Sequence, residues 1–328
     1  MSTTSFLGHA KKRSWPWVDP VDPSIYLCHQ FWPKISIITP SFNQGKYIEE
    51  TILSVINQNY PNLEFIIIDG GSIDQTVEII KKYNSKITFW TSEKDNGQAD
   101  ALNKGIEKCT GEIFNWINSD DYLTKNALFN LALEFDLKNY DLFAACVNNF
   151  DEISKISTLF KNNNLDIRKF LHVNKQANYY YHQPGIWFNL YKYKELGLLD
   201  TSLRYCFDHD FTLRYLVKNN KVKYSDLIVV NFRYHSESKS ISEQAHFDSE
   251  FGIAYKNFYY SLPFFHKLKV QAKRRYKSYQ WHLSLKTICE SQNGKSRKVI
   301  LILKEIFKSP FFRATRFTAG TLKKLLSE

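Results

Sequence analysis

The sequence predicts an α/β protein in which helices cover both faces of a mostly parallel sheet, followed by a basic helical extension. The sheet is predicted because short runs of β-branched residues alternate with segments of helical spacing, and polar clusters follow the runs. The extension is predicted from charge, since residues 251–328 carry 17 Lys and Arg against 3 Glu, whereas residues 1–250 carry 27 against 30. The net charge of +11 therefore resides in the C-terminal segment, which indicates a separate electrostatic role.

The composition limits the class of protein. A chain of 328 residues with 43% apolar and 16% aromatic content is long enough for one large domain with an appendage, or for two domains. It contains no apolar run long enough for a membrane-spanning helix, and its N-terminus lacks the apolar core of a signal peptide, so we expect a cytoplasmic protein. The five cysteines are scattered and predict neither a disulfide framework nor a zinc site.

Strands and helices alternate from residue 34 onward. Strands are predicted at 34–40, 63–72, 86–92 and 112–118, and helices at 45–58, 74–83 and 98–109. This order is typical of parallel β-α-β units, in which ligands gather at the carboxyl ends of the strands. After residue 140 the pattern changes to shorter β segments and two helices, at about 190–197 and 207–219.

These patterns divide the chain into three regions. Residues 1–33 are expected to form an extended arm packed by Trp15, Trp17 and Trp32. Residues 34–245 form the main domain, whose halves are 34–122 and 123–245, and residues 246–328 form the basic amphipathic helical region.

Three polar clusters follow predicted strands: Thr39-Pro40-Ser41, Asp69-Gly70-Gly71-Ser72, and Asn118 to Asp121. One such cluster is typical of a turn, but three at a common edge favour a binding site. Neither a G-x-G-x-x-G turn nor a P-loop occurs, and the loop after the first strand reads "TPSFNQGKY". A divalent cation held by carboxylates is therefore the expected means of binding a diphosphate.

The stretches "ISIITPSFNQGKYIEETILSVINQNYPNLEFIIIDGGSIDQT", "SEKDNGQADALNKGI" and "FNWINSDD" resemble the family 2 glycosyltransferases of the GT-A (Rossmann-like) fold. The resemblance runs from about residue 34 to about residue 240, and the D-G-G-S and N-S-D-D motifs resemble a subgroup of the family. It implies an inverting transferase that uses a nucleotide-diphosphate sugar with Mn²⁺ or Mg²⁺. Residues 34–122 would then bind the nucleotide, and residues 123–245 would bind the acceptor.

The resemblance also assigns roles to individual residues. The base of the nucleotide would contact Asp69, and the ribose would lie near Asp120. The metal would be bound by Asp121, with His235 as a candidate third ligand. "YCFDHDFTLRY" matches the segment that carries the catalytic base, which places the base at Asp208 and leaves Asp210 as a helix-terminal acid. The remaining residues assigned to the donor are Thr39, Pro40, Ser41, Asn43, Asp100 and Asn118.

Three positions depart from the family pattern. Gly70 stands where a second acid is frequent, Leu102 replaces an arginine that would contact the diphosphate, and Phe207 replaces a glutamate before the base. These departures affect the expected donor and the placement of the base, but Asp69, Asp121 and Asp208 remain.

Several side chains have two interpretations. His182, Gln183 and Trp187 either face the acceptor or pack in a core, with packing the preferred role of Trp187. His209 and His246 are expected at the surface.

The predicted activity is transfer of a sugar to a glycan or lipid-linked acceptor in cell-surface polysaccharide or glycoconjugate synthesis. The expected donor is a UDP-linked sugar. A sugar-nucleotide nucleotidyltransferase is one alternative, although those enzymes usually carry a glycine-rich loop after the first strand. An inactive scaffold that binds carbohydrate or membrane is the other.

The basic tail also has alternatives. Its mixture of Lys and Arg with Phe, Leu, Ile and Tyr suits an anionic membrane, which would place the protein at the inner face of that membrane. A solvated helical pair is the plainer interpretation. Nucleic acid is not an expected partner because no nucleic-acid motif accompanies the charge.

Overall fold

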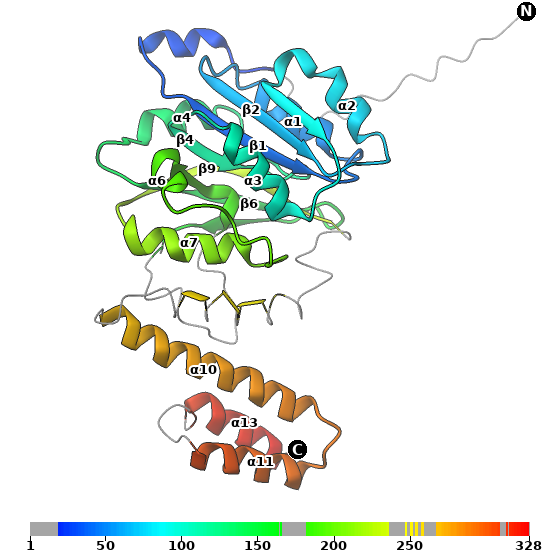
Figure 1. The fold of residues 1–328 in the computed structure, drawn as a ribbon, viewed down its shortest axis with the longest axis vertical. Helices are drawn as coiled ribbons and strands as arrows, with labels where there is room; N and C mark the ends of the chain where they lie inside the picture. Colours follow the sequence, from blue (N-terminus) through cyan, green and yellow to red (C-terminus); the bar gives the residue numbers. More distant parts are fainter. Residues whose placement is uncertain are drawn as a thin grey trace, which may run out of the picture. The chain divides into compact units, whose positions relative to one another are not determined.

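The computed structural model describes residues 19–163, 165, 182–235, 267–308, 313 and 315–327, together with positions 247, 250, 251, 253, 254, 257 and 258; for 267–277 it describes the backbone alone. The chain divides into two compact units (Figure 1). The first comprises Met1–Asn163, Tyr181–Thr201 and Asn219–Ser242, and the second comprises Asn164–Tyr180, Ser202–Lys218 and Glu243–Glu328.

The first unit is built on one nine-stranded sheet with the order β3-β2-β1-β4-β8-β6-β9-β5, and β7 pairs with β6 outside this path. The strands are β1 Ile35–Ser41, β2 Leu63–Asp69, β3 Phe89–Ser92, β4 Ile113–Trp116, β5 Tyr122–Leu123, β6 Leu142–Asp151, β7 Ser157–Lys161, β8 Ile186–Asn189 and β9 Val222–Tyr234.

The first four strands are parallel, as the alternation of strands and helices predicted. Every residue of β1 is buried, which agrees with its content of Ile and Thr, because helices cover both faces of such a strand. The register pairs Ser41 with Asp69, so the polar clusters after β1 and β2 lie side by side.

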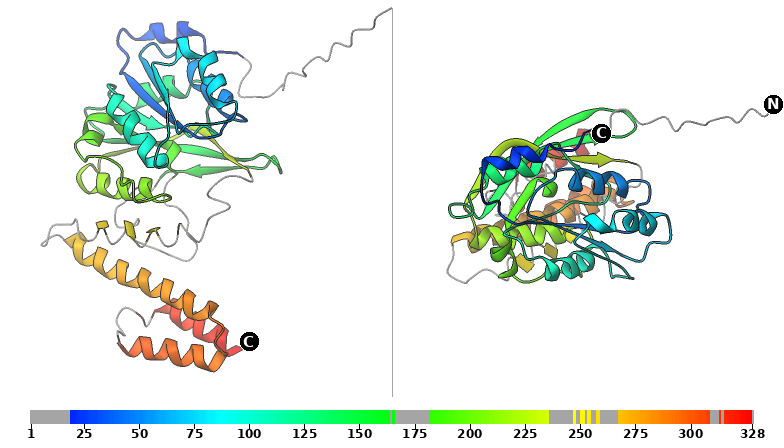
Figure 2. Two further views of the ribbon diagram at one scale, coloured as in Figure 1. Left: turned by 45° about the vertical axis from the view of Figure 1, so that its right-hand side comes forward. Right: turned by 90° about the horizontal axis from the view of Figure 1, so that it is seen from above.

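The other half of the sheet is mixed. β8 is antiparallel to both β4 and β6, β9 is parallel to β6, and β5 is antiparallel to β9. β6 and β7 form an antiparallel hairpin (Figure 2). The predicted parallel arrangement therefore holds for β1 to β4 and gives way to mixed pairing beyond β4.

The helices of the first unit are α1 Ile48–Ile56, α2 Thr76–Lys82, α3 Gln98–Lys108, α4 Ala127–Glu134 and α6 Leu190–Lys194. α1 buries Ile48, Ile52 and Val55 in a core that also contains Ile35 and Ile37 of β1. α3 packs on the opposite face, where a Cβ on Gly105 would lie 2.8 Å from the Ile38 side chain. Glycine permits this close approach, and helices cover both faces of the sheet.

The segment before β1 contains a short 3-10 helix, Pro23–Cys28, within the region expected to be an extended arm. Tyr26 and Trp32 pack edge-to-face at 5.3 Å and contact Phe129 of α4. Trp32 thus packs as predicted, whereas Trp15 and Trp17 lie outside the described residues.

The second unit contains α7 Phe207–Lys218, α10 Lys267–Glu290, α11 Lys295–Lys308 and α13 Arg316–Ser327. The last three pack around a small core of Trp281, Leu285 and Ile302. Trp281 Nε1 donates to Thr318 Oγ1 at 2.9 Å, which satisfies the buried indole. The basic helical extension predicted from charge is confirmed as three helices with a core of their own. Among the described residues, no helix is both long and apolar enough to cross a membrane.

Candidate functional site

The carboxyl ends of β1 and β2 meet at one edge of the sheet. Gly70 N donates to Ser41 O at 2.8 Å, continuing the parallel ladder by one residue. Thr39 and Ser41 are 0% and 5% exposed, and Pro40 is paired with Ile68. Among the described residues, Thr39 Oγ1 and Ser41 Oγ have no hydrogen-bond partner. A buried hydroxyl without a partner costs free energy, so two at one strand end indicate polar atoms of a ligand or water there.

Asp69 organises the loop after β2. Its carboxylate is buried and accepts hydrogen bonds from Gly71 N at 3.2 Å, Ser72 N at 2.9 Å, Ser72 Oγ at 2.5 Å and Ser92 Oγ at 2.7 Å. Gly71 has φ +84°, a conformation that favours glycine. These bonds give Asp69 a structural task in the loop, and its predicted contact with the base stays a prediction.

Asn43 joins the loops after β1 and β2. Its backbone N donates to Ser72 Oγ at 2.7 Å, and its Oδ1 accepts from Ile73 N at 3.0 Å. Asn43 itself has φ 52°, which asparagine tolerates better than most residues. Asn43, which is predicted to bind the donor, therefore fixes the shape of the loops after β1 and β2.

Asp95, which the sequence analysis did not single out, lies beside Gly70. A Cβ on Gly70 would come within 2.7 Å of Asp95 Oδ2, so the space left by the missing second acid is filled by this carboxylate. Burial raises the pKa of Asp95. Asp100, in the first turn of α3, accepts from Asn96 N at 3.0 Å and thereby closes the same loop.

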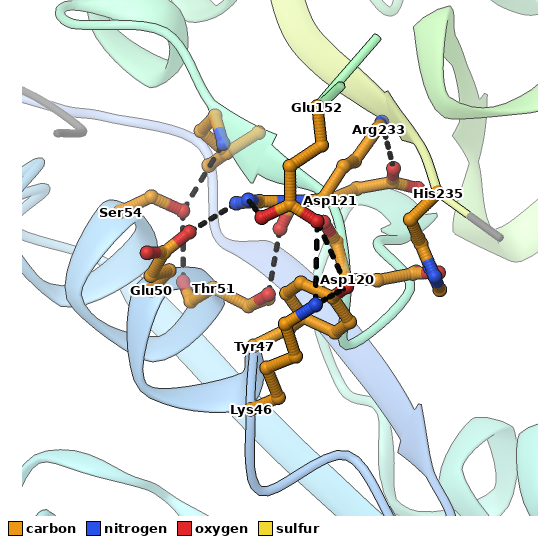
Figure 3. Close-up of polar contacts among 11 residues, drawn as sticks. Lys46, Tyr47, Glu50, Thr51, Ser54, Asp120, Asp121, Glu152, Arg233 and His235 are labelled. Carbon is orange, nitrogen blue, oxygen red and sulfur yellow. Dashed lines mark hydrogen bonds and ion pairs between the residues drawn. The ribbon is translucent and has the colours of Figure 1, made fainter. Parts of the chain in front are cut away.

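The N-S-D-D segment is held at the sheet edge by α1 and β9. Asn118 Oδ1 accepts from Gln98 Nε2 at 2.8 Å, which links the segment to α3. Thr51 Oγ1 donates to Asp121 O at 2.6 Å, and Arg233 N donates to Asp121 Oδ1 at 3.0 Å (Figure 3). β5 follows immediately, and its antiparallel pairing with β9 sets this register.

The two adjacent acids lie in different environments. The Asp121 side chain is fully buried, and Asn118 Nδ2 donates to its second oxygen at 3.3 Å. Burial raises the pKa of Asp121 well above its ordinary value, and the neighbouring Asp120 carboxylate adds to the increase. The Asp120 side chain is 23% exposed, and its Oδ2 lies 3.0 Å from His235 Nε2.

The pairing of Asp120 with His235 bears on the metal assignment. A carboxylate and an imidazole, completed by diphosphate and water oxygens, form a donor set that fits Mn²⁺ or Mg²⁺. Within the residues that the structure describes, no three His, Cys, Asp or Glu side chains are grouped as a metal cluster. The residues present thus fit a cation whose remaining ligands come from the substrate. The assignment of the metal to Asp121 stays a prediction, and Asp120 is the acid whose side chain lies beside His235.

Arg233 is a buried cation at the centre of a charge network that the sequence analysis missed. Its guanidinium contacts Glu50 and Glu152, and its Nε donates to Asp120 O at 3.0 Å. The arginine side chain is 5% exposed and lies 4.9 Å from the centre of the Tyr47 ring (Figure 3). A planar cation with several donors can hold the N-S-D-D segment, α1 and the end of β6 together.

Tyr47 connects this network to the Asp120–His235 pair. Its ring lies 4.6 Å from the His235 ring, and its hydroxyl donates to Glu152 at 3.0 Å. Lys46 Nζ donates to the same hydroxyl at 2.6 Å. Lys46, a cation on the loop after β1, therefore contacts the tyrosine whose ring packs against His235.

Asp208, the predicted base, lies in the first turn of α7 in the second unit. It is partly exposed, and its Oδ1 accepts from His209 N at 2.7 Å. Asp210 is buried and pairs with Arg214 at 2.9 Å, which agrees with a structural role at the helix terminus. The role of Asp208 stays a prediction.

Glu250 supports the start of α7. Its carboxylate accepts from Arg204 N at 2.9 Å, Tyr205 N at 2.6 Å and Cys206 N at 3.0 Å. A carboxylate at this position also interacts favourably with the helix dipole. A residue of the C-terminal region thus completes the helix that carries Asp208.

Other predicted positions have clear locations. Trp187 is fully buried and packs in the core, as preferred. Gln183 is buried and donates to Asn115 Oδ1 at 2.8 Å. The prediction that His209 lies at the surface is wrong: it is 8% exposed, and burial lowers its pKa to about 3. His246 lies outside the described residues.

Comparisons with known proteins agree with this arrangement. An uncharacterized glycosyltransferase of Rickettsia typhi is 29% identical over 211 residues, which cover 62% of this chain and 64% of the relative. Poly(ribitol-phosphate) β-N-acetylglucosaminyltransferase TarS of Staphylococcus aureus is 32% identical over 114 residues, covering 33% of this chain and 20% of TarS. The chain thus spans less than two thirds of these relatives.

Solved structures share the fold. The crystal structure of TarS 1–349 with UDP-GlcNAc superposes with a TM-score of 0.61 at 17% identity and covers 81% of this chain and 78% of that one. The mannosyltransferase PcManGT of Pyrobaculum calidifontis with GDP-Man and Mn²⁺ gives 0.56 at 15% identity, covering 96% and 90%. These likenesses confirm the GT-A fold predicted from the sequence. The model of glycosyl transferase family 2 matches residues 36–214, more than half of the chain, and the protein therefore belongs to this family.

Proposed function

We propose that this protein is an inverting glycosyltransferase that moves a sugar from a nucleotide diphosphate to a hydroxyl of a glycan or lipid-linked acceptor. One observation carries the proposal: Asp120 and His235 form a 3.0 Å pair at the sheet edge where the nucleotide of an α/β protein is expected. Family membership supports the same reaction class.

The donor is proposed to be UDP-linked, in line with the UDP-GlcNAc bound by TarS, although PcManGT binds GDP-Man. Thr39 and Ser41 supply buried hydroxyls to the nucleotide, and Asp95 supplies a carboxylate beside the loop after β2. Lys46 supplies a positive charge near the pair, which compensates for the absence of an arginine at Leu102.

Asp120 and His235 would hold Mn²⁺ or Mg²⁺. The cation, when bound, neutralises negative charge on the leaving diphosphate, so no general acid is required on that side. Asp121 then has a structural role: it accepts from Arg233 N and Asn118 Nδ2 and keeps the segment that carries Asp120 in place. This proposal moves the metal from Asp121, where the resemblance placed it, to Asp120.

Asp208 would be the general base. It accepts the proton of the acceptor hydroxyl as that oxygen attacks the anomeric carbon from the face opposite the diphosphate, which inverts the configuration. One carboxylate suffices for this chemistry. Its place in the first turn of α7 suits a carboxylate, because the helix dipole favours negative charge there.

The alternative activities are less well supported. A nucleotidyltransferase would need phosphate-binding glycines after β1, and "TPSFNQGKY" supplies one glycine. An inactive scaffold would have no need of a carboxylate–imidazole pair beside buried hydroxyls without partners among the described residues. The setting we propose is synthesis of a cell-surface polysaccharide or glycoconjugate, as the name of the relative TarS suggests for that protein. We also propose that the protein is attached peripherally to the inner face of the membrane.

The experiment is calorimetric titration of the full chain with a panel of nucleotide-diphosphate sugars, with and without Mn²⁺. We expect one UDP-sugar to bind more tightly when Mn²⁺ is present, and incubation with an acceptor to release UDP. Absence of nucleotide binding in both conditions would overturn the proposal. Binding that is indifferent to Mn²⁺ would remove the role of Asp120 and His235 as metal ligands.

A further inference from the structure

α11 has an inner and an outer face. On the inner face, Ile302 is fully buried in the core of the three C-terminal helices, and Ile306 packs against that core. On the outer face, Ile300, Leu303 and Phe307 are 52%, 43% and 85% exposed. Their spacing of three and four residues aligns them along one stripe of the helix. Single exposed apolar residues are ordinary, but an aligned stripe marks an interaction surface.

Positive charge lies along the same stripe. Arg297 and Lys304 are exposed and lie three residues before and four residues after Ile300, and Lys308 follows Phe307. The one acid of α11, Glu305, pairs with two cations, Lys308 at 2.5 Å and Arg313 at 2.7 Å, so this cluster keeps a net positive charge. The outer face of α11, defined as Arg297, Ile300, Leu303, Lys304, Phe307 and Lys308, therefore combines apolar insertion groups with cations.

This combination selects one occupant. Nucleic acid would engage the cations but would leave a large exposed Phe and two aliphatic side chains in water. An anionic bilayer satisfies both kinds of group, because apolar side chains enter the boundary between head groups and acyl chains while Lys and Arg remain among the phosphates. We propose that the outer face of α11 docks the protein on an anionic lipid surface. This inference goes beyond sugar transfer and does not depend on it.

The test is co-sedimentation of the full chain with vesicles of phosphatidylcholine mixed with phosphatidylglycerol, and with vesicles of phosphatidylcholine alone. The triple variant Ile300→Ser, Leu303→Ser, Phe307→Ser should bind anionic vesicles at least about tenfold more weakly, because three apolar side chains lose their burial. Leu27→Ser is the matched control, since Leu27 is 84% exposed in the first unit and should not affect binding. The variant Arg297→Gln, Lys304→Gln should lower binding to anionic vesicles and weaken the dependence of that binding on salt.

Three results would overturn the inference: no binding of the unaltered protein to anionic vesicles, equal binding of the triple variant, or loss of a dimer in the triple variant while vesicle binding persists. The last result would assign the face to a second copy of the chain. Sugar transfer to a soluble acceptor, measured on the same samples, should be retained by the triple variant. Failure of transfer in every sample would count against the proposed function, while vesicle binding would still decide this inference.

Discussion

The Nε2 atom of His235 lies 3.0 Å from Oδ2 of Asp120, although 115 residues separate the two along the chain. The antiparallel pairing of β5 with β9 brings them together, because Tyr122 lies opposite Asn231 and the residues before β5 therefore face those after β9. The pair thus depends on strand register as well as on the identity of its two members.

The first prediction concerns the two adjacent acids. Asp120→Asn should weaken the apparent affinity for Mn²⁺, measured by metal-dependent donor binding, by more than about tenfold, since a carboxylate ligand becomes a neutral amide. His235→Gln should produce a loss of similar size. Asp121→Asn should keep most metal dependence, because Asp121 is buried and its oxygens are hydrogen-bonded within the protein.

The sequence resemblance leads to the opposite order, with Asp121 as the ligand and Asp120 near the ribose. Donor titrations at several Mn²⁺ concentrations separate the two assignments. Retention of metal dependence in Asp120→Asn, with its loss in Asp121→Asn and an unchanged fold by circular dichroism, would restore the original assignment.

The second prediction concerns Arg233. Arg233→Met should lower the free energy of unfolding by about 1–3 kcal/mol, because Glu50 and Glu152, which are 17% and 23% exposed, would lose the cation that pairs with both. Urea denaturation measures the loss. The double variant Glu50→Gln, Arg233→Met should recover part of the lost stability, since one uncompensated charge is removed. Equal stability of the single variant Arg233→Met and this double variant would argue against the network.

The parallel half of the fold could be predicted from the sequence because its signals are local. β1 to β4 and α1 to α3 each carry their own apolar periodicity, and the polar ends of β1, β2 and β4 meet at one edge through parallel pairing. α4 and β9 were not predicted. Burial alternates along β9 from 223 to 228 and then breaks at the adjacent buried residues Val229 and Val230, so the strand as a whole lacks the clean alternation of a half-buried strand.

The candidate site was less predictable because its contacts are distant in sequence. Arg233 contacts Glu50 and Glu152, which lie 183 and 81 residues away, and no local motif encodes that meeting. Asp120 and Asp121 are indistinguishable as letters, and their different burial depends on where α1 and β9 lie around them.

The third prediction concerns the base. Asp208→Asn should lower kcat by about 100-fold or more while donor affinity stays unchanged, because the amide cannot accept the acceptor proton. Asp210→Asn is the matched comparison: it weakens the pair with Arg214 and should affect stability more than turnover. Full turnover of Asp208→Asn would assign the base to another residue.

The fourth prediction concerns Glu250, whose carboxylate accepts three backbone N–H groups at the start of α7. Glu250→Ala should reduce the free energy of unfolding of this unit by about 1–2 kcal/mol, the usual cost of losing a helix N-terminal acceptor. Glu250→Gln should lose less, since its amide oxygen still accepts. If Asp208 is the catalytic base, kcat should fall more in Glu250→Ala than in Glu250→Gln, while donor affinity stays the same in both. An unchanged kcat in Glu250→Ala would show that Glu250 does not position Asp208.

The fifth prediction is a pH dependence of stability that originates at His209. Burial lowers the pKa of His209 to about 3 from an ordinary value of 6.5, so the folded state keeps the ring neutral while the unfolded chain takes up a proton below about pH 6.5. Stability is therefore lost as the pH falls through that range, and at pH 5 the loss amounts to about 2 kcal/mol, from 1.36 kcal/mol per pH unit.

His209→Phe should remove this contribution, because phenylalanine fills the same buried space and can retain the ring contact with Phe251. Urea denaturation at pH 7.5 and pH 5 measures the difference between variant and unaltered protein, which cancels the titration of other groups. His29→Gln, at an exposed position, is the control for replacing a histidine. An identical slope in His209→Phe would mean that the unfolded chain gains no extra proton at this position.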